Sequence, residues 1–546
     1  ILYKPFLTEN PLVEKRIDPV IVIPGIMGSA YKNGELVIDP ILHTYDDLIA
    51  TLIANGYEKG KDLFTFPYEW QDSNILTAAF LRNKINQIQE ICQCQKVDIV
   101  AHSMGGLVAR QYIQSAHYGG DVDQLIFLGT PHRGSQQSYL RWEAGEFESG
   151  ILNFFTKYFF NEEAKINGFK NIFDYIHNRP ITSVQQLLPT FNYLKDKDTG
   201  TIRTYPNNYP TNTFLENLNI NISSLLNSGV RITNIVGNVG NNTIDKIRVI
   251  PSTKNGLWEN GEPDGFYEDN GDNGLERGAG DNTVSIFGAT LDNSIINKES
   301  QSNHIRIPTI EENEVFKILT GKTSTTNIDT GFNISPIILL LQLQSPIDFV
   351  ITAPDGKKIG KNFITGEEYN EIPYAFYSGY QTEEEYITIL NPIDGEYKVE
   401  VQGTGTGGKY GVLTSYISDE FATTTEVIGL TEPNQITKLG VVVDNQNPQN
   451  IEIIKEVSIE SIINDINKAY DLGWIKDKKI RDSLIKQVKL IVKFEQKRNG
   501  KHEKKVDKIL MKLLEKELDL LLKKGKINQE AYNIIKEDLN WLILNN

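Results

Sequence analysis

Short runs of branched apolar residues alternate with longer amphipathic stretches in the N-terminal part of the chain. A continuous apolar run bounded by turn residues is typical of a strand buried on both faces. Apolar residues at helical spacing occupy 75–91, between two of these runs. Strands that alternate with helices favour βαβ units and a mostly parallel sheet. We therefore expect an α/β domain over 1–325, with buried strands at 18–23, 97–100, 125–128 and 231–236.

Residues 135–230 interrupt this alternation. The segment is rich in aromatic side chains and contains no strong strand pattern. A long insertion after a sheet strand is the expected position of a helical lid or cap. The alternative is that the rings only fill the insertion's own core.

The pattern changes again over 326–450. Apolar and polar residues alternate along 396–401, which is the two-residue period of a half-buried strand. Two more short strands are expected at 337–343 and 348–352, and Pro354-Asp355-Gly356 is a turn signal. The pattern predicts an antiparallel β-sandwich.

Residues 451–546 show helical spacing throughout, interrupted by glycines, and predict a small bundle of three or four helices. This segment holds 21 Lys and Arg against 16 Asp and Glu, although the whole chain has a net charge of −16. The change of sign indicates a domain boundary near residue 450. Its lysines are expected to form a solvated face, with contact to an anionic cell surface as the alternative.

Composition narrows the class of protein. The acidic balance disfavours a nucleic-acid partner, because phosphate binding needs a cationic face. The longest apolar run, 337–343, is too short to span a bilayer. The chain begins at Ile1 without a Met, so we expect a trimmed or processed chain whose targeting signal is not visible. The expected location is secreted or on the cell surface, of bacterial type, with which the near absence of cysteine is compatible. The only cysteines, Cys92 and Cys94, exclude a disulfide framework and are expected to be two unreactive thiols.

The strongest chemical signal is Ala101-His102-Ser103-Met104-Gly105, directly after the strand at 97–100. It matches the G-x-S-x-G nucleophile elbow with Ala in place of the first Gly. Small residues are required there because the turn from strand to helix is very tight. The following helix N-terminus favours negative charge beside the hydroxyl. The motif predicts that Ser103 is a nucleophile.

A serine hydroxyl needs a base that takes its proton. In folds that carry this nucleophile elbow, the chain order is Ser, acid, His. His304 lies in a loop after the last sheet strands and before an apparent helix at 311–319, so it is the candidate base. Asp281 is the candidate acid that would orient the imidazole. Competing acids lie in the acidic stretch before it: Asp264, Asp269 and Asp272.

The oxyanion of a tetrahedral intermediate needs two donors. One is expected from the backbone N–H of Met104, the residue after the nucleophile. The other is expected from the glycine-containing loop 24–29, with Ile26 as first choice and Met27 as second.

Residues 254–281 form an acidic loop rich in Gly and Asn. Carboxylate and carbonyl oxygens on such a loop suit Ca²⁺, although the spacing is not that of an EF-hand. The predicted ligands of a structural calcium ion are Asp264, Glu268, Asp269 and Asp272. The alternative is a solvated acidic loop.

Several motifs together resemble α/β-hydrolase lipases, especially lecithin–cholesterol acyltransferase-like proteins. The resemblance implies an α/β-hydrolase fold with a helical lid, and ester hydrolysis or acyl transfer on lipid-like substrates through Ser103, Asp281 and His304. The motifs are Pro24-Gly25-Ile26-Met27-Gly28-Ser29, Phe66-Pro67-Tyr68-Glu69-Trp70, Ala101-His102-Ser103-Met104-Gly105-Gly106, Gly129-Thr130-Pro131-His132-Arg133-Gly134-Ser135 and Gly280-Asp281-Asn282-Thr283-Val284.

The expected function is therefore a serine carboxylic-ester hydrolase that needs no cofactor for its chemistry. Its partners would be a lipid or other acyl-ester substrate and, through the C-terminal domains, a lipid or cell surface. An acyltransferase that passes the same acyl group to an alcohol is the alternative within enzymes. A non-catalytic surface-adhesion protein is the alternative outside them.

Overall fold

The computed structural model describes residues 18–148, 151–268, 271–292, 294–328, 337–381, 385–418, 422–447, 451–495 and 504–545. The chain divides into two compact units. The first comprises 1–30, 36–148 and 155–333, and the second comprises 31–35, 149–154 and 334–546. The sandwich and the C-terminal helices thus belong to one unit.

A six-stranded sheet, parallel throughout, forms the centre of the first unit, in the order β12-β8-β6-β5-β1-β4. The four predicted strands are confirmed as β1 (Val20–Ile23), β5 (Val97–His102), β6 (Val122–Leu128) and β8 (Arg231–Gly237). The sequence pattern missed the two edge strands, β4 (Leu63–Thr65) and β12 (Ile296–Ser300).

Helices cover both faces of this sheet because successive strand residues point to opposite sides. Ile21 and Ile23 of β1 pack with apolar residues of α2 (Asn74–Cys92) and α3 (Met104–Gln114). Val20 and Val22 instead pack with α1 (Asp46–Ala54) and α12 (Glu312–Thr320). This three-layer arrangement is the expected α/β-hydrolase architecture.

The insertion at 135–230 is mostly helical, as predicted. Its helices are α4 (Gln137–Ala144), α5 (Ile151–Ile166), α6 (Ile172–Asn178), α7 (Thr182–Gln186), α8 (Thr213–Ile220) and α9 (Ile222–Leu226). Several of its rings, including Phe160 and Tyr175, pack into the same apolar core as α2 and α3. The rings therefore fill a core that is continuous with that of the domain.

The acidic stretch 254–281 contains two short strands besides its loops. It contributes β10 (Glu262–Pro263) and β11 (Leu275–Gly278), which pair antiparallel with β9 (Thr243–Ile250). A short strand of the insertion, β7 (Leu194–Asp196), adds to β9 in parallel. Smaller elements of the first unit and its boundary are β2 (Ser29–Lys32), β3 (Glu35–Ile38), α10 (Ile286–Ala289), η1 (His304–Arg306) and α11 (Ile307–Ile310).

The predicted sandwich is present in the second unit as two antiparallel sheets. One has the order β17-β18-β13-β20-β21 and the other β16-β15-β14-β19-β22-β23. Their inner faces meet in one apolar core that includes Leu341, Phe349 and Val399. The strands are β13 (Ile337–Gln344), β14 (Ile347–Thr352), β15 (Lys358–Lys361), β16 (Glu368–Asn370), β17 (Ala375–Tyr377), β18 (Tyr386–Leu390), β19 (Gly395–Gly403), β20 (Gly408–Ser418), β21 (Ala422–Thr431), β22 (Ile436–Val443) and β23 (Glu452–Lys455).

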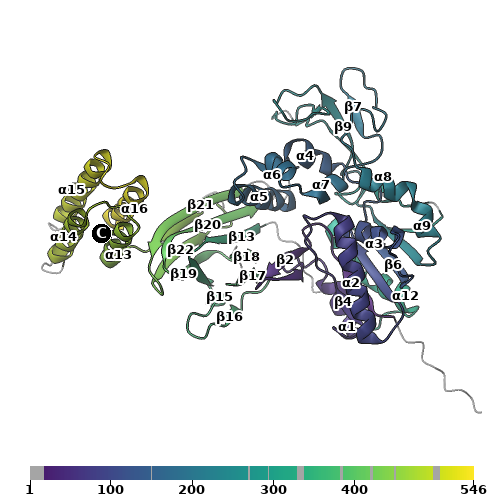
Figure 1. Cartoon of the computed structure of the whole chain (residues 1–546), viewed down its shortest axis with the longest axis horizontal. Coiled ribbons are helices and arrows are strands. Elements are labelled where there is room, and N and C mark those ends of the chain that lie inside the picture. Colours follow the sequence, from purple (N-terminus) through teal and green to yellow (C-terminus); the bar gives the residue numbers. More distant parts are fainter. Residues whose placement is uncertain are drawn as a thin grey trace, which may run out of the picture. The chain divides into compact units, whose positions relative to one another are not determined.

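The described C-terminal residues form the helices α13 (Ile459–Asp471), α14 (Lys478–Glu495), α15 (Lys504–Lys523) and α16 (Gln529–Asn545), which gather into a bundle in yellow tones in Figure 1. Their apolar stripes share one core with Leu430 of β21. Buried Lys455 of β23 also reaches Asp465 of α13 and Asp538 of α16. Bundle and sandwich are thus joined by apolar and ionic contacts.

The expectation of two free thiols is wrong. Cys92 and Cys94 are joined by a disulfide. Cys92 is the last residue of α2, and Gln93 adopts a left-handed conformation that turns the chain back, so the two Cα atoms lie 5.2 Å apart. The helix end supplies a geometry that an extended pair of neighbours would lack.

Candidate active site

Ser103 occupies the turn between β5 and α3. Its φ of 53° and ψ of −127° form a strained backbone conformation for a residue with a side chain. A Cβ on Gly105 would lie 2.4 Å from the carbonyl oxygen of Pro24, so no larger residue fits there. Ala101 is also fully buried. These contacts explain why small residues surround the serine.

His304 and Asp281 complete a hydrogen-bonded chain to this serine. Nε2 of His304 lies 2.8 Å from Oγ of Ser103, and Nδ1 lies 2.7 Å from Oδ2 of Asp281. Asp281 follows β11 and His304 follows β12, so the topology brings together residues 201 positions apart. His304 is 7% exposed, Ser103 6% and Asp281 0%.

The other oxygen of Asp281 is held by the backbone. Oδ1 accepts from the amides of Thr283 at 2.9 Å and Val284 at 2.6 Å, which leaves Oδ2 for the imidazole. The backbone N–H of His304 also donates to the carbonyl of Asp281 at 2.8 Å. A Cβ on Gly129 would come within 3.2 Å of both Oδ2 and Nδ1, so a glycine here allows the end of β6 to approach the pair.

The backbone segments that carry the two predicted oxyanion donors lie beside Ser103. Met104 is the first residue of α3, and first-turn amides have no acceptor within their own helix. On the other side, a Cβ on Gly25 would lie 2.8 Å from Cβ of Ser103, so the loop that carries Ile26 packs directly against the serine. Met27, the second choice, has a φ of 57°.

Sequence reasoning missed two residues that contact this site. The ring of His102 joins the backbone carbonyl of His304 to the hydroxyl of Tyr45. Burial, followed by the nearby His304, lowers the pKa of His102 well below its usual value, so its ring is neutral. Burial raises the pKa of Tyr45 well above its usual value, so its hydroxyl keeps its proton. The only sequence signal was the position of His102 next to the nucleophile.

Cations occupy much of the predicted calcium site. Asp264 pairs with Lys197 at 2.7 Å and with Arg248 at 3.0 Å. Asp272 lies 2.6 Å from the same Arg248. Lys197 and Arg248 lower the pKa of Asp264, and the backbone N–H of Gly274, followed by Arg248, lowers the pKa of Asp272. Asp269 lies outside the described residues, and Glu268 is not part of any group of three possible metal ligands among the described residues. Calcium binding stays a prediction.

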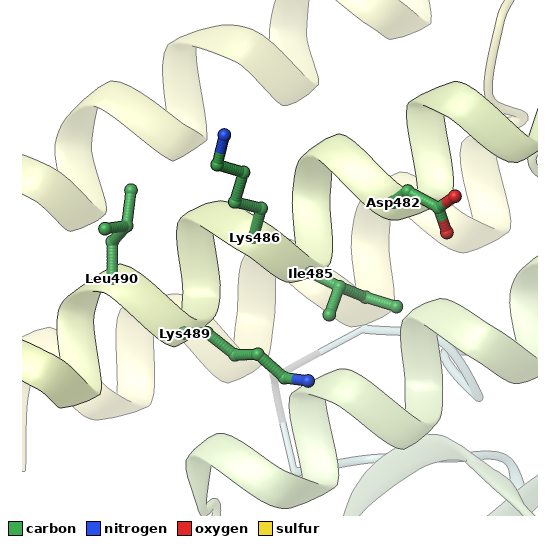
Figure 2. Close-up of a pocket in the computed structure, with 5 residues that line it drawn as sticks. All are labelled: Asp482, Ile485, Lys486, Lys489 and Leu490. Atoms are coloured by element: carbon green, nitrogen blue, oxygen red, sulfur yellow. The ribbon is translucent and has the colours of Figure 1, made fainter.

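A hollow on α14 of the second unit does not offer comparable chemistry. It has a volume of about 380 Å³ and is open to solvent. Figure 2 shows its lining side chains, Asp482, Ile485, Lys486, Lys489 and Leu490, which all come from one helix. None of them is a serine or histidine. Over the described part of the chain, we find no helix with the length and apolar character needed to cross a membrane.

Comparison with known proteins shows which families and structures this chain is similar to. Residues 33–244 match the family model of Lecithin:cholesterol acyltransferase, a range that contains Ser103 but ends before Asp281 and His304. A 98-residue stretch is 30% identical to Phospholipase A(1) LCAT3 of Arabidopsis thaliana and covers 17% of this chain and 22% of that protein. Lecithin-cholesterol acyltransferase-like 4 of the same plant is 29% identical over 98 residues, which is 17% of this chain and 18% of that protein.

The chain thus spans about a fifth of the length of these curated relatives. Among solved structures, the mature Bacillus licheniformis lipase BlEst2 is 17% identical, with 58% of this chain and 96% of that chain covered and a TM-score of 0.31. The product of the Listeria innocua gene lin2722 is 12% identical, with 57% and 97% covered and a TM-score of 0.29.

Proposed function

We propose that this chain, with its LCAT-like segment and α/β-hydrolase fold, is a serine carboxylic-ester hydrolase that acts on lipid-like acyl esters through an acyl-enzyme. The observation that carries the proposal is the pair of hydrogen bonds made by His304, to Oγ of Ser103 at 2.8 Å and to Asp281 at 2.7 Å. A base within this distance of a strained, helix-capping serine is the arrangement that nucleophilic acyl transfer requires.

In the proposed reaction, Nε2 of His304 takes the proton of Ser103 while Oγ attacks the ester carbonyl. The negative charge on the carbonyl oxygen is stabilised by the amides of Met104 and Ile26. Asp281 holds the tautomer of His304 and stabilises the imidazolium. His304 then returns the proton to the leaving alcohol, and water resolves the acyl-enzyme by the reverse steps. This chemistry requires no cofactor.

Labelling with a fluorophosphonate tests the proposal directly. We expect wild-type protein to be labelled at Ser103 and Ser103→Ala to remain unlabelled. Ser252→Ala is the matched control, because Ser252 is an exposed serine of the same unit and should not affect labelling. A folded wild-type protein that resists the probe would reject the proposal, and would favour a non-catalytic adhesion protein.

The lipid-like character of the substrate is supported by the matched family and by the names of the two plant relatives. It is also supported by the aromatic insertion at 135–230. Activity on a series of monomeric and micellar esters tests it. A rise in rate above the micellar threshold is expected for a lipase, and a rate that depends only on total ester concentration would indicate an esterase for dissolved substrates.

The second candidate is acyl transfer to an alcohol, which the description of the matched family favours. The same acyl-enzyme serves both reactions, and the choice depends on which nucleophile reaches it. Product analysis with and without an acceptor alcohol separates them. A new ester that forms at the expense of free acid would establish the transferase.

We further propose that the second unit attaches or spaces the enzyme outside the cell, on a lipid or cell surface. Co-sedimentation of the full chain with cells or vesicles tests this proposal. The proposed structural Ca²⁺ in the acidic stretch is tested separately with a chelator. If the ion binds, chelation lowers both the melting temperature and the activity; unchanged values reject the site.

A further inference from the structure

A line of three hydrogen bonds runs beneath the candidate site. The amide of Gly25 lies 2.9 Å from the hydroxyl oxygen of Tyr45, and that oxygen lies 2.8 Å from Nδ1 of His102. Nε2 of His102 lies 2.9 Å from the carbonyl oxygen of His304. Tyr45 is 3% exposed and His102 5%, so solvent does not readily replace these partners.

The direction of every bond in this line is fixed by chemistry. An amide can only donate, so the Tyr45 oxygen accepts from Gly25. Tyr45 has one proton, which it donates to Nδ1 of His102. A neutral imidazole whose Nδ1 accepts carries its proton on Nε2, and this proton is donated to the carbonyl of His304, which can only accept. The line is fully satisfied when His102 is neutral.

The two ends of the line belong to different parts of the proposed machinery. Gly25 precedes Ile26, whose amide is the proposed oxyanion donor from the loop after β1. His304 follows β12, at the far edge of the sheet from β4. Strands β5, β6 and β8 separate β1 from β12, so these two strands do not pair directly, and the sheet connects their loops only through three intervening strands.

We propose that Tyr45 and His102 are positioning residues. They hold the loop that carries Gly25 and Ile26 and the segment that begins at His304 at a fixed separation around Ser103. The inference rests on the proposed function. Neither residue touches the reacting atoms; each acts through the backbone that carries a reacting group.

A neutral His102 has a second consequence. Its ring centroid lies 4.8 Å from that of His304. A positive charge at this distance would oppose formation of the His304 imidazolium during acyl transfer. The hydrogen-bond line avoids this opposition, because a protonated His102 would have to place a second N–H against the Tyr45 hydroxyl.

The decisive variant is Tyr45→Phe, which keeps the ring and removes only the hydroxyl. It leaves the Gly25 amide and Nδ1 of His102 without their partners. We expect kcat and the rate of fluorophosphonate inactivation to fall about tenfold, the effect of one misplaced buried hydrogen bond. KM should change little, and the melting temperature should fall only by the cost of two unpartnered buried groups. Tyr57→Phe is the matched control, since its buried hydroxyl has no hydrogen-bond partner among the described residues.

Two substitutions of His102 sharpen the test. His102→Gln keeps an N–H that can reach the His304 carbonyl and should retain most of the rate, whereas His102→Leu should lose at least as much as Tyr45→Phe. The double variant Tyr45→Phe/His102→Leu should be no slower than His102→Leu alone, because both changes break one line.

The outcomes separate the two proposals. If wild type is labelled and Tyr45→Phe is labelled at the same rate, the positioning role is overturned while the proposed function stands. The positioning role is also overturned if the loss of rate in each variant is proportional to its loss of melting temperature and His102→Gln is as slow as His102→Leu. If wild type is not labelled at all, the proposed function fails and this inference fails with it.

Discussion

Each unit of the molecule contains a buried group of three polar side chains, and the two groups differ in kind. The first unit has Ser103, His304 and Asp281, linked at 2.8 and 2.7 Å. The second has Lys455 between Asp465 at 3.2 Å and Asp538 at 2.7 Å. Both groups assemble from distant segments, and both are nearly inaccessible to solvent.

The difference lies in the backbone around them. Ser103 has a strained φ of 53°. Gly25 allows the backbone to pack against Ser103, and Gly129 allows it to pack against Asp281 and His304. The second group stands on a regular strand and two regular helices, and it consists of one ammonium and two carboxyl groups. Burial raises the pKa of the Asp465 carboxyl well above its usual value. Burial and proximity alone therefore do not indicate catalysis. The feature that does indicate catalysis is a strained backbone that holds a hydroxyl beside first-turn amides.

The largest effect is expected from Asp281→Asn. The amide can still accept from Val284, but it cannot hold His304 in the tautomer that accepts the serine proton. We expect kcat to fall by about 10⁴-fold, as for the same change in other serine triads, with a small change in melting temperature. Steady-state kinetics and thermal unfolding measure the two quantities.

Asp272→Asn is the control, because Asp272 is exposed and paired with Arg248. A comparable fall in kcat for this variant would show that the loss reflects the acidic stretch as a whole. Near wild-type activity in Asp281→Asn would instead remove this residue from the proposed machinery.

The second largest effect is expected from Lys455→Met, which leaves two carboxyl groups buried without their cation. Breaking a buried ion pair from one side costs about 3–5 kcal/mol of unfolding free energy. Hydrogen exchange of α13 and α16 should accelerate accordingly. Turnover by the first unit should not change, which is the contrast with Asp281→Asn.

Lys438→Met is the matched control. The Lys438 side chain is 59% exposed, and its Nζ lies as far as 3.7 Å from the nearest carboxylate oxygen of Glu400. An exposed pair contributes little, so this variant should exchange like wild type. If Lys455→Met abolished turnover while leaving α13 and α16 protected, the contrast between a reactive and a structural group would be wrong.

The sequence was sufficient wherever the signal was local. Mostly apolar runs identified β1, β5, β6 and β8, because a strand buried on both faces has few exposed polar residues. The edge strand β12, Ile-Asn-Lys-Glu-Ser, lacks that pattern because it has one neighbour and is partly exposed. Ser103 was identified because the elbow imposes its own small residues.

Contacts that depend on the folded backbone could not be predicted from the sequence. Tyr45 and His102 are 57 positions apart, and neither belongs to a spacing motif that would connect them. The disulfide between Cys92 and Cys94 depends on the left-handed Gln93, a single backbone angle that no pattern of apolar residues reports. The antiparallel sheet of β9, β10 and β11 was missed because its connections are rich in Gly and Asn.

A smaller effect, dependent on pH, is expected in the first unit from Asp98. Burial, with smaller effects of Asp18 and Asp123, raises the pKa of Asp98 to about 7, although Gln124 donates to it. The folded state therefore keeps a proton that the unfolded chain releases above about pH 4. Stability should fall as pH rises from about 4 to 7, by up to about 4 kcal/mol.

Asp98→Asn should flatten this dependence, because the amide does not ionise. Hydrogen exchange of β5 at a series of pH values measures it. The same slope in the variant would assign the effect to another group.

The smallest effect is expected from the disulfide. Cys92 and Cys94 enclose a single residue, and a cross-link that closes so short a loop removes little freedom from the unfolded chain. Its contribution is at most about 2 kcal/mol. Reduction, or the Cys92→Ala/Cys94→Ala variant, should lower the melting temperature slightly and leave turnover unchanged, because the side chain of Gln93 still donates to the carbonyl of Glu90 at the end of α2. A large loss of activity on reduction would mean that the turn after α2 is coupled to Ser103, and the contrast between one reactive group and its structural surroundings would have to be redrawn.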